Sequence, residues 1–221
     1  MTLRKGLPWG RPASAPADVV AEGDDAALAV VVAEHPGARV SFRAAPASDF
    51  ARAVGLGGAS DSTTELPCDV LEVEADGTVQ TAVNMVVFGT APDRQRWWSR
   101  AQRVLVRVDG RVVHDGDAVG VVIANGQHLR GYDVVPRGHP GDGRAEVHVY
   151  ELGRGERRAM RGRLRDGAHV PHPRIVTSSS SRQVDVWAAE GIRRLEIDGR
   201  PRSQVTGLAV TVRPAAFLLL V

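Results

Sequence analysis

Residues 121–152 read VVIANGQHLRGYDVVPRGHPGDGRAEVHVYEL and contain turn and strand signals in close succession. A run of valine and isoleucine precedes Asn125-Gly126, a glycine-containing loop then leads through Pro136 to Asp142-Gly143, and a second apolar run follows. Asn-Gly and Asp-Gly are preferred in tight turns, and β-branched residues are preferred in strands. The stretch therefore predicts two β-strands that are joined by a long loop.

The same turn chemistry recurs on both sides of this stretch. Runs rich in valine and isoleucine are separated by Asp76-Gly77, Asp109-Gly110, Asn125-Gly126 and Asp198-Gly199. Repeated dipeptides of this kind are typical of hairpins, so we expect a sandwich or barrel of antiparallel strands. Residues 68–74 are predicted to form one strand, and residues 79–88 the strand that returns from it.

Two arginine-rich segments interrupt the predicted strands. Residues 93–103 contain Trp97 and Trp98, and residues 155–165 read GERRAMRGRLR, which favours an amphipathic or surface helix in each case. Adjacent helix positions point in different directions, so we expect one indole to be buried and the other exposed. The alternative is a membrane-interface anchor, with both indoles at headgroup depth and the neighbouring arginines on lipid phosphates.

The start of the chain favours a small α/β unit. Residues 17–20 and 38–42 are predicted strands, and between them a helix is predicted over residues 25–34. Asp24 precedes this helix, where its carboxylate can accept from a free backbone N–H. The order is therefore strand, helix, strand.

A second helix is predicted over residues 49–54. Ser48 stands at its N-cap position, the charge of Asp49 suits the helix dipole in the first turn, and Gly55 can end the helix. Residues 57–67 are polar and turn-rich and are predicted to be a linker. We expect an α+β protein with an irregular lead-in over residues 1–16, a truncated α/β nucleotide-domain remnant over 17–60, and a larger antiparallel β-sandwich domain over 61–221 whose last strands can pack back on the first part.

Composition narrows the classes of function. The chain has 221 residues, of which 43% are hydrophobic, and this is enough for a buried core. The formal charge is only +2 and Lys5 is the single lysine, so nucleic acid is not an expected partner. Cys68 stands alone, which excludes an intrachain disulfide. We expect a cytoplasmic protein with no transmembrane segment, whose contact with a membrane would be peripheral.

The order and spacing of these motifs resemble the diacylglycerol kinase-like family, which includes sphingosine and bacterial lipid kinases and is related in architecture to NAD kinases. The positions that match are Asn84, Gly89, Asn125, Gly126, Gly131, Pro136, Asp142, Gly143, Gly167, His169, His172 and Pro173. RRLEIDGRP, residues 193–201, is similar to the family's Asp-Gly-Glu turn, with Arg200 in place of Glu. The resemblance implies a nucleotide site in the first part of the chain and a lipid site in the second.

Two N-terminal segments align with the family's nucleotide-binding loops. AEGDDAAL, residues 21–28, aligns with Gly-Gly-Asp-Gly-Thr, and APASDFARAVGL, residues 45–56, aligns with Gly-Thr-Gly-Asn-Asp-Phe-Ala-Arg. The nucleotide-site residues that this resemblance retains are Gly23, Asp24, Asp49 and Arg52. The residues that replace family positions are Glu22, Asp25 and Ala26 in the first loop and Ala45, Pro46, Ala47 and Ser48 in the second.

These replacements weaken a phosphate site. Glycines allow several N–H groups to approach phosphate oxygens, whereas Pro46 has no N–H and the carboxylates of Glu22 and Asp25 repel a triphosphate. Phosphoryl transfer depends on positioning and on electrostatic stabilisation, so a loop that cannot hold ATP loses most of its catalysis. ATP and Mg²⁺ are therefore expected as cofactors only if the chain is active.

Asp142 has two interpretations. By the family's pattern it is the candidate general base that accepts the proton of a lipid hydroxyl. Alternatively, Asp142-Gly143 is a β-turn that needs these residues only for its conformation, and Asp198-Gly199 has the same alternative as a hairpin turn. His169 and His172 lack a third ligand and lie among prolines, so we expect loop packing there and no metal.

Three functions remain open from the sequence. The first is a catalytically impaired lipid-kinase-like protein that binds a lipid or a protein partner through its β domain. The second is an active ATP-dependent lipid kinase that phosphorylates a lipid hydroxyl, because Asp24, Asp49 and Asp142 are all retained. The third is a homo-oligomeric scaffold, such as a homodimer formed through an exposed sheet edge.

Overall fold

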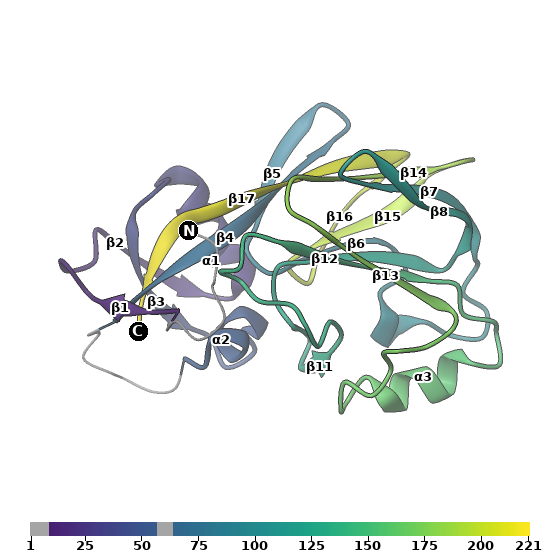
Figure 1. Cartoon of the computed structure of the whole chain (residues 1–221), viewed down its shortest axis with the longest axis horizontal. Coiled ribbons are helices and arrows are strands. Elements are labelled where there is room, and N and C mark those ends of the chain that lie inside the picture. Colours follow the sequence, from purple (N-terminus) through teal and green to yellow (C-terminus); the bar gives the residue numbers. More distant parts are fainter. Residues whose placement is uncertain (1–8, 57–63) are drawn as a thin grey trace.

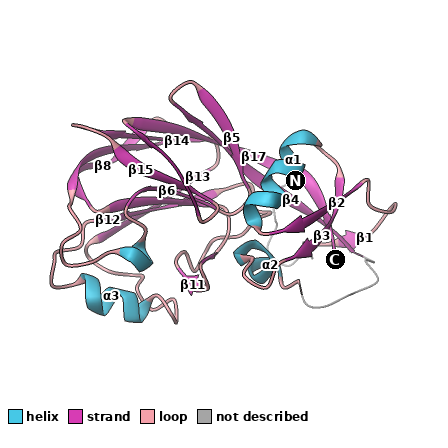
Figure 2. Ribbon diagram, turned by 180° about the vertical axis from the view of Figure 1, so that it is seen from behind, coloured by secondary structure: helices cyan, strands magenta, loops and turns pink. Residues whose placement is uncertain are grey.

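The computed structural model describes residues 9–56 and 64–221, which form an N-terminal α/β half and a larger β-sandwich half (Figure 1). Helices are short in the described chain, and strands dominate it (Figure 2). The helices are α1 (Asp25–Glu34), α2 (Asp49–Val54), α3 (Arg157–Arg163) and the 3-10 helix η1 (Pro92–Arg94). The predicted α+β class, with a reduced α/β part followed by an antiparallel β-sandwich, is confirmed.

The larger sheet extends through both halves. Its nine strands are β1 (Arg11–Pro12), β2 (Val19–Gly23), β3 (Arg39–Ala44), β4 (Thr64–Ala75), β5 (Thr78–Ala82), β7 (Gln102–Val108), β8 (Arg111–Ala118), β14 (Gln183–Ala188) and β17 (Gly207–Leu220). In the β half the order is β5-β4-β17-β14-β7-β8, all antiparallel. In the N-terminal half β17 pairs in parallel with β3, which pairs in parallel with β2.

The second sheet lies wholly in the β half. Its order is β13-β12-β9-β6-β15-β16, and every pair is antiparallel. The strands are β6 (Met85–Gly89), β9 (Gly120–Ala124), β12 (Ala145–Tyr150), β13 (Ile175–Ser180), β15 (Arg193–Ile197) and β16 (Arg200–Val205). A separate small hairpin, β10 (His128–Leu129) with β11 (Tyr132–Asp133), lies near α2 (Figure 1).

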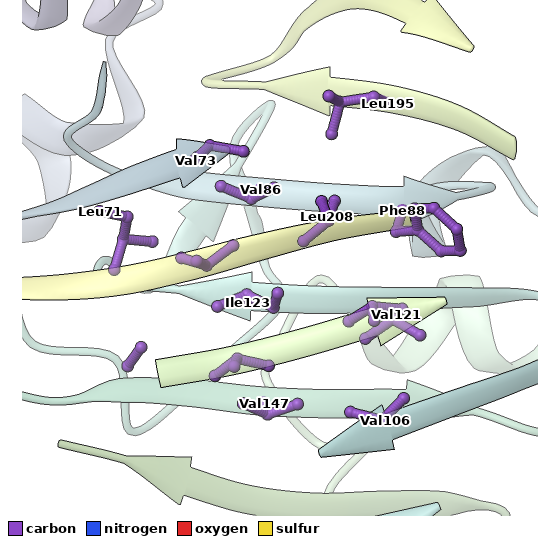
Figure 3. Packing of buried hydrophobic residues seen from close by; sticks show 14 of the residues in the cluster. Leu71, Val73, Val86, Phe88, Val106, Val121, Ile123, Val147, Leu195 and Leu208 are labelled. Carbon is purple, nitrogen blue, oxygen red and sulfur yellow. The ribbon is translucent and has the colours of Figure 1, made fainter. Parts of the chain in front are cut away.

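An apolar core fills the space between the two sheets (Figure 3). Leu71 and Leu208 come from the larger sheet, Phe88 and Ile123 come from the second sheet, and all four are at most 4% exposed. Side chains alternate between the faces of a strand, so each strand contributes every second residue to this cluster. The interior of the sandwich is therefore occupied by the protein's own side chains, and a binding site must lie at its surface or at its junction with the other half.

The two N-terminal helices are confirmed with the predicted bounds. The Asp24 carboxylate accepts from the backbone N of Ala27 at 3.1 Å, and the Ser48 hydroxyl accepts from the backbone N of Ala51 at 3.0 Å. Gly55 ends α2 in the left-handed region, with φ 71°. These signals were read correctly because a cap and its helix are only a few residues apart.

Three of the four predicted hairpin turns are confirmed. Both residues of Asp76-Gly77, Asp109-Gly110 and Asp198-Gly199 have positive φ, as a type I′ turn requires. Asn125-Gly126 was predicted wrongly, because the buried Asn125 amide donates to the carbonyls of Asp69 (2.9 Å) and Val83 (2.8 Å) instead. Gly126 is needed there for close approach, since a Cβ would lie 2.2 Å from an oxygen of Asn84.

One strand prediction and part of the linker prediction were wrong. Residues 79–88 are not one strand but parts of β5 and β6, which belong to different sheets. The chain changes sheets at residues 83–84, where the Asp198 carboxylate binds the backbone amides. Part of the predicted linker, residues 57–63, lies outside the described residues, and its remaining part, residues 64–67, forms the start of β4.

The arginine-rich segments have different outcomes. Residues 157–163 form α3, as predicted, but residues 93–103 contain the end of η1, an irregular loop and the start of β7. The helix is missing because Arg157 donates to the carbonyls of Arg96, Trp97 and Ser99, which a helix would need for its own amides. The expected division of the two indoles is also wrong, since Trp97 is 65% exposed and Trp98 is 61% exposed.

Candidate functional site

The two degenerate loops meet the start of the β half in a buried polar cluster. Asp25, the first residue of α1, is 5% exposed and accepts from the Ser48 hydroxyl at 2.6 Å and from the backbone N of Phe50 at 3.0 Å. The side-chain amide of Asn84 donates to the same carboxylate at 3.0 Å and to the carbonyl of His128 at 3.0 Å. Asp25 therefore joins both loops to the segment that enters β6.

Asp198 closes this cluster from the turn between β15 and β16. Its carboxylate accepts three consecutive backbone N–H groups, from Val83, Asn84 and Met85, each at 2.9 Å. Asp198 is 7% exposed and has φ 48°, a conformation that Asp and Asn tolerate better than most residues. The carboxylate thus fixes the backbone at the place where the chain passes from one sheet to the other.

Burial shifts the pKa values of both carboxyl groups upward. The pKa of Asp25 is raised to about 6, chiefly by burial, although the hydrogen bonds from Ser48 and Phe50 oppose the shift. Burial raises the pKa of Asp198 to about 7 against the effect of its three N–H donors, and the nearby Asp25 charge raises it further. The two acids repel one another when both are ionised, so the site favours at least one proton near neutral pH.

Asp24 lies beside this cluster and is engaged by an arginine from the β half. The Nε of Arg200 lies 3.0 Å from the Asp24 carboxylate, and Nη2 of Arg200 also donates to the same oxygen. Burial alone would raise the pKa of Asp24, but the hydrogen bonds from Arg200 and from the N–H of Ala27 outweigh it and lower the pKa. Arg200 stands where the family has Glu, so this substitution provides the positive partner of the retained Asp24.

The other retained nucleotide-site residues lie around the same loops. The Gly23 carbonyl accepts from the backbone N of Ala45 at 2.7 Å, which holds the two loops together. The Asp49 carboxylate is 7% exposed and accepts from the backbone N–H groups of Arg130 and Gly131, the latter at 2.8 Å. Arg52 is exposed on α2. The predicted set is therefore brought together, while the roles assigned to it remain predictions.

Asp142 lies in a different group, next to Asp69. The Asp69 carboxylate accepts from the backbone N–H groups of Gly143 (2.6 Å) and Ala215 (2.7 Å), and burial raises its pKa to about 6. The Asp142 carboxylate accepts from the backbone N of Arg144 in its own turn at 3.0 Å, and burial raises its pKa as well. Among the described residues, Asp142 therefore does not belong to the polar cluster of Asp24, Asp25, Asp49 and Asp198.

Sequence reasoning did not single out the centre of the cluster. The loop alignment predicts for Asp25 only the replacement of a glycine, and the sequence predicts for Ser48 only a helix cap and the replacement of a residue in the second loop. The adjacent acids Asp24 and Asp25 at the start of a helix could have indicated the cluster. One carboxylate can cap the helix, and the second is then free to accept hydrogen bonds from another segment. The contacts of Asp198 could not be found, since they depend on how β6 pairs with β15.

The structure also bears on the expectations for His169 and for a membrane-spanning segment. His169 is buried and its Nε2 lies 2.8 Å from the carbonyl of Val134, in agreement with a packing role. Within residues 9–56 and 64–221, His, Cys, Asp and Glu form no group of three or more that could hold a metal ion. No helix in the described part of the chain is long and apolar enough to span a bilayer.

The sandwich and its Asp198 turn can now be compared with known proteins. Residues 81–221 match the model of a family described as the YegS C-terminal NAD kinase beta sandwich-like domain. The chain belongs to this family. The YegS-like match begins just before Asn84 and includes the second sheet, the Asp198 turn and β17. Among curated proteins, no sequence matches the chain.

Solved structures extend the similarity to the N-terminal half. A diacylglycerol kinase from Bacillus anthracis strain Sterne has a TM-score of 0.67 at 15% identity, over 92% of this chain and 76% of the other. A structure from the same strain, of a protein assigned as a diacylglycerol kinase, has a TM-score of 0.72 at 14% identity, over 92% of this chain and 78% of the other. The YegS-like chain therefore has a diacylglycerol kinase-like fold, as the sequence motifs predicted.

Proposed function

We propose that this chain is a catalytically impaired member of the lipid-kinase-like family, which acts by binding a partner through its β half. The observation that supports this most directly is the ion pair between Asp24 and Arg200. In the family's pattern an acid stands at each of these positions, and two acids can share a bound cation. Here an acid and a base neutralise one another instead.

The other retained acids are also engaged by the protein itself. Asp49 accepts two backbone N–H groups of the loop between β10 and β11, and Asp198 accepts three at the start of β6. Carboxylates that are held in this way have fewer lone pairs for a hydrated cation. These residues stabilise the junction of the two halves, which explains their retention without catalysis.

Mg·ATP does not fit the loops as they are arranged. Pro46 provides no N–H, and the exposed Glu22 carboxylate pairs with Arg43 at 2.6 Å on the surface of the same loop region. The Asp25 carboxylate, at a family glycine position, fills the junction with hydrogen bonds to Ser48 and Asn84. The loops therefore lack the groups that would position a triphosphate for phosphoryl transfer.

Asp142 fits a turn residue better than a general base. A base must be positioned against the hydroxyl from which it takes the proton. Asp142 is held by its own turn, and its close ionisable neighbours include the acids Asp69 and Glu146. We assign it to the conformation of the loop that precedes β12.

The test measures nucleotide binding and turnover separately. Mg·ATP binding is followed by calorimetry, and phosphorylation of diacylglycerol and of long-chain bases is followed for the unmodified chain and for Asp142→Asn. We expect no heat of binding and no product in either protein. Turnover that disappears with Asp142→Asn would show that the chain is an active lipid kinase and would overturn the proposal.

A further inference from the structure

The loop after η1 presents two large aromatic side chains to solvent. Trp97 is 65% exposed and Trp98 is 61% exposed, and their rings are in edge-to-face contact with centroids 5.4 Å apart. Exposure of apolar surface is unfavourable, at about 25 cal/mol per Å². An adjacent pair of exposed indoles therefore suggests a surface that is covered by something else.

A buried arginine holds this loop in place. Arg157, at the start of α3, is 3% exposed, and its guanidinium donates to the carbonyls of Ser99 (2.6 Å), Arg96 (3.0 Å), Trp97 (3.3 Å) and Leu152 (3.0 Å). None of the described acidic side chains forms a salt bridge with it. Because the loop carbonyls point toward Arg157, the conformation that exposes the indoles is built into the fold.

The same surface contains a concentration of unpaired positive charge. A hollow of about 610 Å³ lies between α3 and the tryptophan loop, residues 95–101. Its arginines are Arg96, Arg154, Arg158, Arg161 and Arg165. None of these five has a salt bridge to an acid of the described chain, whereas Arg94 and Arg174 nearby are paired with Glu196 and Glu156. Arg158 and Arg161 lie three positions apart on one face of α3, and Arg154 and Arg165 line the same hollow from the turns just before and after the helix.

We propose that the tryptophan loop (residues 95–101) and α3 form a docking surface for an anionic membrane. Guanidinium groups bind phosphates through several N–H donors, and indoles are favoured at the depth of lipid headgroups. The formal charge of the chain is only +2, which does not favour a nucleic acid as the partner, so the exposed indoles beside the arginines fit an anionic membrane better. This inference deepens the proposed function, because it names the partner of the β half.

The position of this surface separates it from the acidic junction. α3 lies at the far side of the β half from α1 and α2 in both views of the molecule (Figures 1 and 2). The docked protein would therefore keep its Asp24–Arg200 pair away from the bilayer. Docking and any nucleotide chemistry can consequently be measured independently.

The test is co-sedimentation of the full chain with vesicles. Phosphatidylcholine vesicles are compared with vesicles in which part of the lipid is phosphatidylglycerol. We expect binding that needs the anionic lipid and weakens with added salt. One basic residue near such a surface contributes about 1 kcal/mol, so Arg158→Glu with Arg165→Glu should weaken binding by about 25-fold or more. The variant Trp97→Ala with Trp98→Ala should also release the protein.

Matched controls change similar residues elsewhere. Arg111→Glu with Arg182→Glu reverses two exposed charges, one at the start of β8 and one in the bend before β14, and Trp187→Ala removes another partly exposed indole. These variants should bind vesicles like the unmodified chain, and thermal unfolding checks that every variant is folded. A blue shift of tryptophan emission on vesicles, absent when Trp97 and Trp98 are replaced, provides a second measurement.

Several results would overturn the docking surface. They are equal binding to neutral vesicles, equal loss of binding in the control variants, or binding to single-stranded DNA but not to vesicles. Lipid phosphorylation in the separate turnover assay would overturn the impaired-kinase proposal alone, because it does not alter which residues hold the vesicle. Absence of vesicle binding with no turnover would remove the docking surface and leave that proposal standing.

Discussion

The substitution Asp198→Asn tests whether one buried carboxyl group holds the junction of the two halves. Asparagine has the same shape and tolerates the φ of 48° at this turn. Its remaining oxygen can still accept from the N–H groups of Asn84 and Met85, but its NH₂ group would face the N–H of Val83. A buried donor left without an acceptor costs about 1–3 kcal/mol, and we expect the unfolding free energy to fall by this amount at low pH.

The cost of this substitution should depend on pH in a defined direction. The pKa of Asp198 is raised from 3.8 to about 7 in the folded chain, so the folded state keeps a proton that the unfolded state has released. The unfolding free energy of the unmodified chain must then decrease as pH rises between these values. The slope is at most about 1.4 kcal/mol per pH unit, or about 4 kcal/mol in all. Asparagine cannot ionise, so its deficit of about 1–3 kcal/mol at low pH should shrink as pH rises and then reverse, because only the unmodified chain loses about 4 kcal/mol.

Urea unfolding of both proteins at several pH values from about 5 to about 8 measures this. Asp25→Asn is the matched comparison, because the pKa of Asp25 is also raised, to about 6. This substitution should likewise reduce the decrease of the unfolding free energy with rising pH. The reasoning is refuted if the unmodified chain becomes more stable toward high pH. In that case the three N–H donors would hold the Asp198 carboxylate ionised, and burial would be the weaker effect.

Three further substitutions test other parts of the fold. Ser48→Ala removes the N-cap of α2 and a buried hydrogen bond, so urea unfolding should show a loss of about 1–3 kcal/mol. Phe88→Ala leaves a cavity between the two sheets and should cost about 3–5 kcal/mol by the same measurement. Gly120→Ala would place a Cβ 2.3 Å from the carbonyl oxygen of Thr90, whereas a Cβ at Gly155 meets no atom within 4 Å. Thermal unfolding should therefore show a clear loss for Gly120→Ala and little change for the Gly155→Ala control.

Local signals in the sequence predicted local structure well. Ser48, Asp49 and Gly55 placed α2 correctly, because each acts within a few residues of the helix end. The Asx-Gly dipeptides marked three real hairpins for the same reason. Where a side chain from a distant segment competes for the backbone, such prediction fails, as it did when Arg157 took the carbonyls of the tryptophan loop.

The contacts of the candidate site were even less predictable from local sequence signals. Asp24 and Asp49 could be assigned to the two loops by resemblance, but the use of each carboxylate could not be predicted from the loops alone. The partner of Asp24 is Arg200, which is 176 positions away, and the pairing of β15 with β6 decides what Asp198 can reach. From the sequence, Arg200 only removes the carboxylate that the family has at this position. The structure shows that it also pairs with Asp24.

The path of β17 has a consequence for how the chain folds during synthesis. Residues 218–220 of this strand pair in parallel with β3, and β4 pairs along both of its halves across a register shift near Ala215. The N-terminal half therefore lacks its central strand until residues 207–220 have left the ribosome. Until then α1 and α2 have an incomplete surface on which to pack, and exposed apolar surface of this kind favours aggregation. Emergence of β17 from the ribosome, rather than synthesis of the first sixty residues, would set the time at which the α/β half becomes stable.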